Sequence, residues 1–133
     1  MTSGVPALDA LTVEPTRPRT DTVLVRVHGT LDRASAPVLD RALQRQAGPS
    51  RPRRLVLDLS DAEFLGLPGV TVLVRAHRRT EAVAGAHPPC LVGLSAAEER
   101  MLGLLGVRDL FHIHDGGDMH DMADQRPAEG TTR

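Results

Sequence analysis

The chain has 133 residues, which suits one domain with one hydrophobic core, and 41% of them are apolar. Only 2% are aromatic, with no Trp and no Tyr. The core must therefore be aliphatic, and the aromatic faces on which single-stranded nucleic acid stacks are not expected. The net charge of −1 predicts no general attraction to nucleic acid or to an anionic membrane surface.

Cysteine content and hydropathy indicate the cellular compartment in which the protein is expected. Cys90 is the single cysteine, so no internal disulfide can form, which fits a reducing environment. No stretch approaches the roughly 18 consecutive apolar residues of a membrane span. The N-terminus lacks the basic residues and apolar run of a signal peptide. We therefore expect a cytoplasmic protein that does not insert into a membrane.

The N-terminal part of the chain predicts two strands. Residues 1–6 are mostly small or polar, and we expect them to be disordered. Residues 7–13 alternate weakly, which indicates a short edge strand. Residues 14–20 contain two prolines, which indicates a loop or hairpin turn. Residues 22–28 alternate regularly and predict a strand with three valines on one face and a partly polar second face.

A helix is predicted next. Ser35 is a suitable N-cap, which places Pro37 in the first turn, and Gly48-Pro49 ends the helix. Asp40 is expected to point outward. The residues expected to form the buried stripe are Val38, Leu39, Ala42 and Leu43.

The rest of the chain is organised around the stretch Arg54–Ala76. Its run Leu55–Leu59 is apolar and rich in β-formers, as in a strand buried on both faces. The helix that follows, roughly Pro68–Val83, has an apolar stripe and an outer face with three arginines that we expect to be solvated: Arg75, Arg78 and Arg79. Residues 64–69 form a tight junction between strand and helix. Open α/β sheets place their sites at the carboxyl ends of strands, so we expect function at this junction.

The last third repeats the alternation of strand and helix. Residues 89–94 predict a short buried strand. Ser95 and Glu98 have the spacing of a capping box at the start of a third helix, which stops at Gly106. Its expected apolar face consists of Ala97, Met101, Leu102 and Leu105.

Three further segments complete the prediction. Residues 110–113 indicate a last short strand, residues 116–124 a final helical segment, and residues 125–133 a disordered tail. Strands that alternate with helices imply mainly parallel pairing with right-handed crossovers. The sequence therefore predicts an α/β domain with a mixed, mostly parallel sheet and about four helices.

Three segments of the chain resemble STAS domains, the fold of anti-sigma factor antagonists. Residues 27–32 resemble the entry strand before the first helix, residues 55–76 the central strand with its helix, and residues 91–111 the last third. The resemblance spans residues 7–124. It implies a STAS fold and a non-enzymatic role in protein–protein interaction within bacterial transcription regulation.

The junction departs from the pattern of this family. STAS antagonists typically carry Asp-Ser-Ser-Gly or Asp-Ser-Thr-Gly there, and the second hydroxyl residue is the phosphoacceptor in the switchable members. In this chain the four positions are Gly66, Leu67, Pro68 and Gly69. Pro68 stands at the acceptor position and cannot be phosphorylated, although it suits the first helical position. Thr71, one turn further, is a weak substitute acceptor.

The resemblance also implies a partner. The expected partner-binding residues are Asp32, Arg33, Gly66, Leu67, Pro68, Gly69 and Thr71. They would dock on an anti-sigma factor with a serine kinase-like fold, and without the switch binding would be constitutive or set by expression level. The alternative for Asp32 and Arg33 is a simple polar loop that enters the helix. The alternative function is that of a STAS scaffold subunit in a larger signalling or ABC lipid-transport assembly.

Histidines and aspartates near the C-terminus raise the question of a metal site. The residues are His112, His114, Asp115, His120 and Asp121. Their spacing matches no known metal motif, and the family that the chain resembles is not metal-dependent. We therefore expect a polar strand end without a metal. The chain also has no Lys for a phosphate-cradling loop, so we expect no cofactor.

Three other side chains could carry chemistry. Asp58 and Asp61 could form a paired-carboxylate acid–base site, but the sequence places no histidine or nucleophile beside them. Cys90 lies in an apolar strand, as an inert core thiol does. We therefore expect no catalytic residue and no enzymatic activity.

Overall fold

The computed structural model describes residues 11–46 and 52–114. Their elements in chain order are β1 (Thr12–Arg19), β2 (Thr22–Leu31), α2 (Ala36–Gln46), β3 (Arg54–Leu65), α3 (Leu67–Glu81), β4 (Cys90–Val92), α4 (Ala96–Leu104), the 3₁₀ turn η1 (Arg108–Leu110) and β5 (His112–His114). The described residues thus contain three of the roughly four predicted α-helices. The helix expected over residues 116–124 lies outside them, as do the expected ends 1–6 and 125–133.

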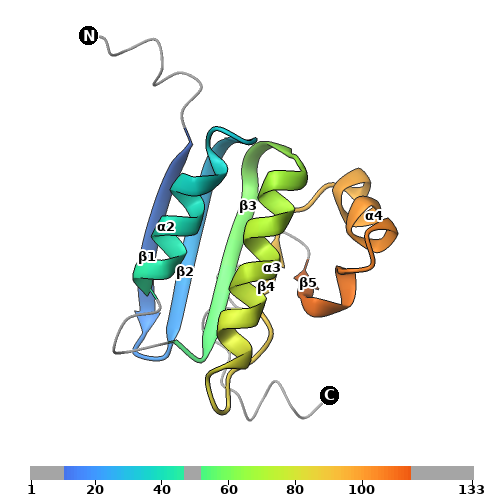
Figure 1. Ribbon diagram of the computed structural model, residues 1–133. Coiled ribbons are helices and arrows are strands. Elements are labelled where there is room, and N and C mark those ends of the chain that lie inside the picture. Colours follow the sequence, from blue (N-terminus) through green and yellow to red (C-terminus); the bar gives the residue numbers. More distant parts are fainter. Residues whose placement is uncertain (1–10, 47–51, 115–133) are drawn as a thin grey trace, which may run out of the picture.

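The five strands form one mixed sheet in the order β1-β2-β3-β4-β5. β1 is antiparallel to β2, and every other pair is parallel. Helices α2 and α3 lie against the same face of this sheet (Figure 1). The α/β class and the mostly parallel sheet predicted from the sequence are confirmed.

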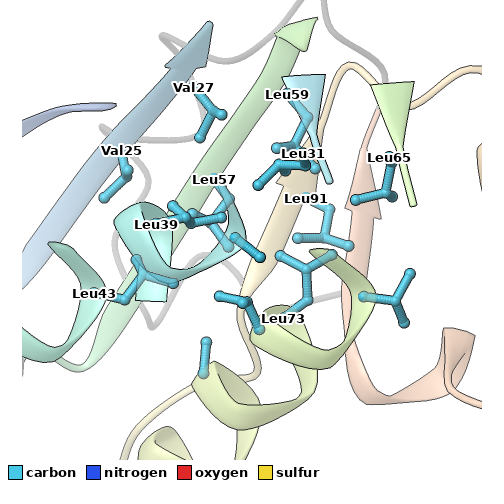
Figure 2. Packing of buried hydrophobic residues seen from close by; sticks show 14 of the residues in the cluster. Val25, Val27, Leu31, Leu39, Leu43, Leu57, Leu59, Leu65, Leu73 and Leu91 are labelled. Atoms are coloured by element: carbon cyan, nitrogen blue, oxygen red, sulfur yellow. The ribbon is translucent and has the colours of Figure 1, made fainter. Parts of the chain in front are cut away.

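The hydrophobic core fills the space between the sheet and these two helices. Figure 2 shows Val25 and Val27 of β2 and Leu57 of β3 on the side of Leu39 and Leu73 from the helices. Among the side chains that the structure describes, the core is aliphatic apart from Phe111. A smaller cluster of Leu24, Val56, Cys90 and Val92 lies on the other face. β3 is therefore buried on both faces, as its unbroken apolar run indicates.

Strand β1 differs from what the sequence predicted for residues 14–20. We expected residues 14–20 to be a loop or turn because of their two prolines, but they form most of an edge strand. Pro15 pairs in register with Val25, and the register shifts between Thr16 and Arg19, around Pro18. An edge strand tolerates proline because one side of its backbone has no partner strand, so a missing N–H costs little there.

Strand β3 is also longer than predicted. The apolar run Leu55–Leu59 marks only its buried half, and the strand continues to Leu65. β2 continues beside it, and Leu31 pairs with Leu65. The second halves of both strands are more polar, which hid them from an apolar pattern. The junction before α3 is therefore a single residue, Gly66.

The helix faces differ from the predicted ones at Asp40 and Val38. Asp40 is buried and accepts hydrogen bonds from Arg79 Nη2 at 2.8 Å and Arg75 Nη1 at 3.3 Å. Val38 was expected in the core but is 43% exposed. Of the three arginines of α3, Arg75 and Arg78 are exposed as predicted, whereas Arg79 is partly buried against Asp40.

Helix α4 begins as predicted but ends differently. The Ser95 hydroxyl oxygen accepts from Glu98 N–H at 3.1 Å, and Glu98 accepts from Ser95 N–H at 2.9 Å, so the capping box is confirmed. Leu102 is buried, whereas Ala97 and Leu105 are exposed. The helix stops at Leu104, and the 3₁₀ turn delays the last strand to residues 112–114.

Candidate functional site

Two loops meet at the carboxyl ends of β2 and β3. Leu31 and Leu65 are register partners, and Gly66 N–H donates a hydrogen bond to the Leu31 carbonyl at 3.0 Å. The loop after β2 therefore lies beside the start of α3, as the sequence predicted. We call this surface the junction edge. Its members are Asp32, Arg33, Gly66, Leu67, Pro68, Gly69 and Thr71.

The junction edge projects from the sheet. β4 ends at Val92, which pairs with Asp58, well before β3 ends at Leu65. β2 and β3 thus extend together beyond the end of β4. The sequence could not show this step, because it depends on the register between strands.

Asp32 is held in a fixed position. Its carboxylate accepts from Ser35 N–H at 3.0 Å, and its own N–H donates to Ser35 Oγ at 3.0 Å. Asp32 therefore caps the turn into α2, and Ser35, the predicted cap, is its reciprocal partner and also donates to the Thr30 carbonyl. The Ser35 N–H stabilises the carboxylate and lowers the pKa of Asp32 below its usual value. The junction edge thus carries an exposed negative charge next to exposed Arg33.

The first turn of α3 starts without a side-chain cap. Gly66 is the N-cap, with extended backbone angles and no side-chain cap bond, and its carbonyl accepts from Val70 N–H at 3.1 Å. Leu67 is the first helical residue, so Pro68 is the second rather than the first. Both positions suit proline, because the N–H groups of the first turn have no intrahelical partner.

Gly69 is fixed by packing. A Cβ atom there would lie 2.8 Å from Leu65 Cδ1 and 3.1 Å from Leu31 Cβ. Both distances are shorter than ordinary carbon contacts. The first turn of α3 therefore lies directly on the ends of β2 and β3, and a side chain at this position would force Leu65 and Leu31 to shift.

The exposed part of α3 at the junction edge is apolar. The Leu67 side chain is 59% exposed. Thr71 is also exposed, and its hydroxyl donates to the Leu67 carbonyl at 3.2 Å, within its own helix. The surface offers an aliphatic side chain, an anion and a cation on a rigid backbone, which suits contact with another protein.

The two aspartates of β3 have separate partners. Asp58 accepts from Ser60 N–H at 3.0 Å and from the Ser60 hydroxyl at 2.6 Å. Asp61 Oδ2 lies 3.3 Å from His28 Nδ1. From the sequence we expected no histidine beside either carboxylate. That expectation was wrong for Asp61, because the parallel register of β2 and β3 places His28 next to it. Asp58 and Ser60 lie where the register between β2 and β3 shifts, so their bonds hold an irregular strand segment.

The histidines of β5 do not assemble a metal site among the described residues. His112 and His114 stack with ring centroids 6.1 Å apart. Asp115, His120 and Asp121 lie outside the described residues. Within residues 11–46 and 52–114, no group of three or more His, Cys, Asp or Glu side chains could hold a metal ion.

Cys90 is a core thiol. It is buried between β3 and β5, and burial raises its pKa to about 11. The thiol is therefore neutral at physiological pH and unsuited to nucleophilic chemistry.

The sequence profile of the STAS domain family matches residues 14–117, which is most of the chain. The chain belongs to the STAS domain family. The resemblance drawn from three segments of the sequence is thereby confirmed. None of the described helices is long and apolar enough to cross a membrane. Among curated protein sequences, none matches this chain.

Solved structures of other STAS proteins share the fold. An anti-sigma factor antagonist from Mycobacterium paratuberculosis is 27% identical, and the match covers 85% of this chain and 91% of that one with a TM-score of 0.69. For the anti-sigma factor antagonist SpoIIAA in its unphosphorylated form the identity is 17%, the coverage 85% and 96%, and the TM-score 0.69. The murine anion transporter Slc26a9 matches at 20% identity over 78% of this chain but 18% of its own, with a TM-score of 0.63. The last two likenesses show the fold alone.

Proposed function

We propose that this STAS domain is a non-enzymatic regulatory protein of the bacterial cytoplasm that acts like an anti-sigma factor antagonist. Its partner would be an anti-sigma factor with a serine kinase-like fold. The similar structures described as anti-sigma factor antagonists support the class of partner. The observation that carries the proposal is the projecting junction edge, where Leu67 is exposed in the first turn of α3 beside the paired ends of β2 and β3.

The junction edge has physical properties suited to docking. Burying the exposed part of a leucine side chain contributes on the order of 1–2 kcal/mol to binding. The loop around Asp32 is held by its hydrogen bonds with Ser35, so little conformational entropy is lost when a partner binds. Asp32 and Arg33 add charges of both signs, which favour one orientation of the partner.

We further propose that the phosphorylation switch of the family is lost. In switchable members a phosphate at the start of this helix would add roughly −1.5 to −2 charges to the docking surface. Pro68 has no hydroxyl at that position, and the Thr71 hydroxyl bonds to its own helix. Binding would then be constitutive and limited by the amount of protein.

A second function is a scaffold role in a larger assembly, such as a transport system. The match to a small part of Slc26a9 supports it, because there the same fold occurs within a much longer protein. In that case the chain would be held permanently in one complex. Light scattering of the complexes purified from the host separates a small binary complex from a large assembly.

The proposed function is tested by affinity purification of the full-length chain from its native host with mass spectrometry. We expect an anti-sigma factor with a kinase-type fold. Leu67→Glu should reduce its recovery about tenfold, since a buried unpaired charge costs more than 1.4 kcal/mol. Leu104→Glu is the matched control, because Leu104 is 83% exposed at the end of α4, outside the junction edge. Recovery of no kinase-like protein, or equal loss with both variants, contradicts the proposal.

A further inference from the structure

A groove of about 260 Å³ lies between the edge strand β1 and helix α2. The two elements run side by side at the margin of the sheet (Figure 1). The described residues that line the groove are Val13, Pro15, Val38, Arg41, Ala42, Arg45 and Gln46. None of them belongs to the junction edge.

The floor of the groove is apolar. Val13 is partly buried and packs against the main core, and Ala42 is buried. Val38 is 43% exposed, although it lies on a helix whose other aliphatic residues Leu39 and Leu43 are fully covered. The sequence pattern assigned Val38 to the core, so its exposure leaves an aliphatic side chain without the cover that the pattern indicates.

The rim of the groove is positively charged. Arg41 and Arg45 are exposed, and within the described part of the chain neither guanidinium makes a hydrogen bond or an ion pair. The one carboxylate of α2, Asp40, binds Arg75 and Arg79 instead. Charge of one sign is thus left uncompensated beside an apolar floor.

Nor does β1 supply a compensating carboxylate. Glu14 is the acidic residue of this strand, and its carboxylate lies 3.7 Å from His28 Nε2. Side chains alternate between the faces of a strand, so Glu14 points to the face opposite Val13 and Pro15. The positive rim therefore faces solvent without a nearby anion on β1 or α2.

The outer edge of β1 disfavours the addition of another strand. Pro15 and Pro18 remove two N–H donors from this edge, as edge strands that avoid pairing often do. A ligand of the groove must therefore bind through side chains. Arg41 and Arg45 lie one helical turn apart, about 6 Å along the axis, which matches carboxylates one turn apart on a second helix.

We propose that this groove binds an acidic amphipathic helix of a partner protein. The aliphatic side chains of the bound helix cover Val38 and Ala42, and the carboxylates of that helix pair with Arg41 and Arg45. The surface is separate from the junction edge. The inference therefore does not depend on the proposed function, and both surfaces can be occupied in one complex.

The probe is a synthetic helical peptide with leucines every three or four residues and glutamates one turn apart on either side. It is titrated into the full-length ¹⁵N-labelled chain and followed by NMR and fluorescence anisotropy. We expect shifts at Val13, Val38 and Ala42. Reversing two exposed charges (Arg41→Glu with Arg45→Glu) should weaken binding about tenfold or more. Arg78→Glu, the same change at an exposed position of α3, should leave it unchanged.

Three results would overturn this inference: no shift at Val38 and Ala42 at millimolar peptide, equal binding by the double variant, or equal binding by a peptide with glutamine for every glutamate. Binding that appears only after deletion of residues 1–10 would also overturn it, because the chain's own N-terminal segment would then be the occupant. If the double reversal unfolds, the neutral pair Arg41→Gln with Arg45→Gln replaces it in the same comparison.

Discussion

Gly69 is the residue of the junction tetrad that this chain shares with the family pattern, and the packing gives the reason. A Cβ atom at this position would lie 2.8 Å from Leu65 Cδ1 and 3.1 Å from Leu31 Cβ, so a methyl group would push both side chains out of place. The Leu67 position is less constrained, because its side chain is exposed. Residues that set the distance between helix and sheet are less free to change.

The role of Gly69 can be measured by making one substitution at two glycines. Gly69→Ala should destabilise the protein by about 1 kcal/mol, because a clash of 1–3 kcal/mol exceeds the helix propensity gained. Gly103→Ala should instead stabilise it by about 0.5–1 kcal/mol, since Gly103 is an exposed helical residue with an open neighbourhood. Urea denaturation gives both values. The same sign for the two variants would refute the packing account.

His87 gives the protein a dependence on pH. Its partial burial, and next the nearby charge of Arg54, lower the pKa of its imidazole below the ordinary 6.5. The unfolded chain then binds a proton more readily than the folded one. This histidine therefore destabilises the folded state as the pH falls through about 6.5, and has no effect above that range.

The expected result is a smaller acid-induced loss of stability in His87→Gln. The free energy of unfolding of the two proteins is compared at pH 7.5 and at pH 5.5. The parent should lose more stability than the variant over this interval. If both lose the same amount, the imidazole has an unperturbed pKa in the folded state.

Among the elements, α2 and α3 are tied by one buried carboxylate. Asp40 receives hydrogen bonds from Arg79 and Arg75 of α3 and from Gln44 of its own helix. A sequence pattern places every charged residue outside, so it could not identify Asp40 as an interior bridge. Asp40 can be recognised as a bridge between the helices only when the arginines of α3 are known to face α2.

Asp40→Asn should lower stability by about 2 kcal/mol, because it removes the charge from a nearly buried hydrogen-bonded site while keeping its shape. Arg75→Ala should cost less than about 1 kcal/mol, since the Arg75 side chain is 60% exposed and its ion pair is screened by water. Thermal and urea unfolding check both. A larger loss of stability in Arg75→Ala than in Asp40→Asn would contradict the role of Asp40 as the main tie between the two helices.

The elements also show what patterns in the sequence can and cannot predict. The core halves of β2 and β3, all three described helices and the capping box at Ser95 follow from periodicity and local rules. β1 did not, because its prolines are acceptable only at an edge, and the edge is a property of the sheet. The polar ends of β2 and β3 have no pattern of their own and form because they pair with each other.

For the whole molecule, the register of the strands creates the candidate site. The loops after β2 and β3 were predicted to meet, and they do, because parallel neighbours end at the same edge. The sequence alone could not show that this edge projects past β4, nor that a basic groove opens between α2 and β1. Both features depend on how the strands are placed in the sheet. The fold thus presents the two surfaces that we propose for protein contact, one at the strand ends and one beside β1.

The central claim is that the junction edge binds a kinase-type anti-sigma factor without a phosphorylation switch. The most direct measurement incubates the full-length chain with the recovered partner and Mg-ATP, then determines affinity by calorimetry and maps phosphate by mass spectrometry. We predict no phosphate within residues 64–71 and an affinity unchanged by ATP. The Pro68→Ser variant, which restores a hydroxyl at the acceptor position, should become phosphorylated and lose the partner. Phosphate on Thr71 or elsewhere in residues 64–71 of the parent chain, with release of the partner, would contradict the account.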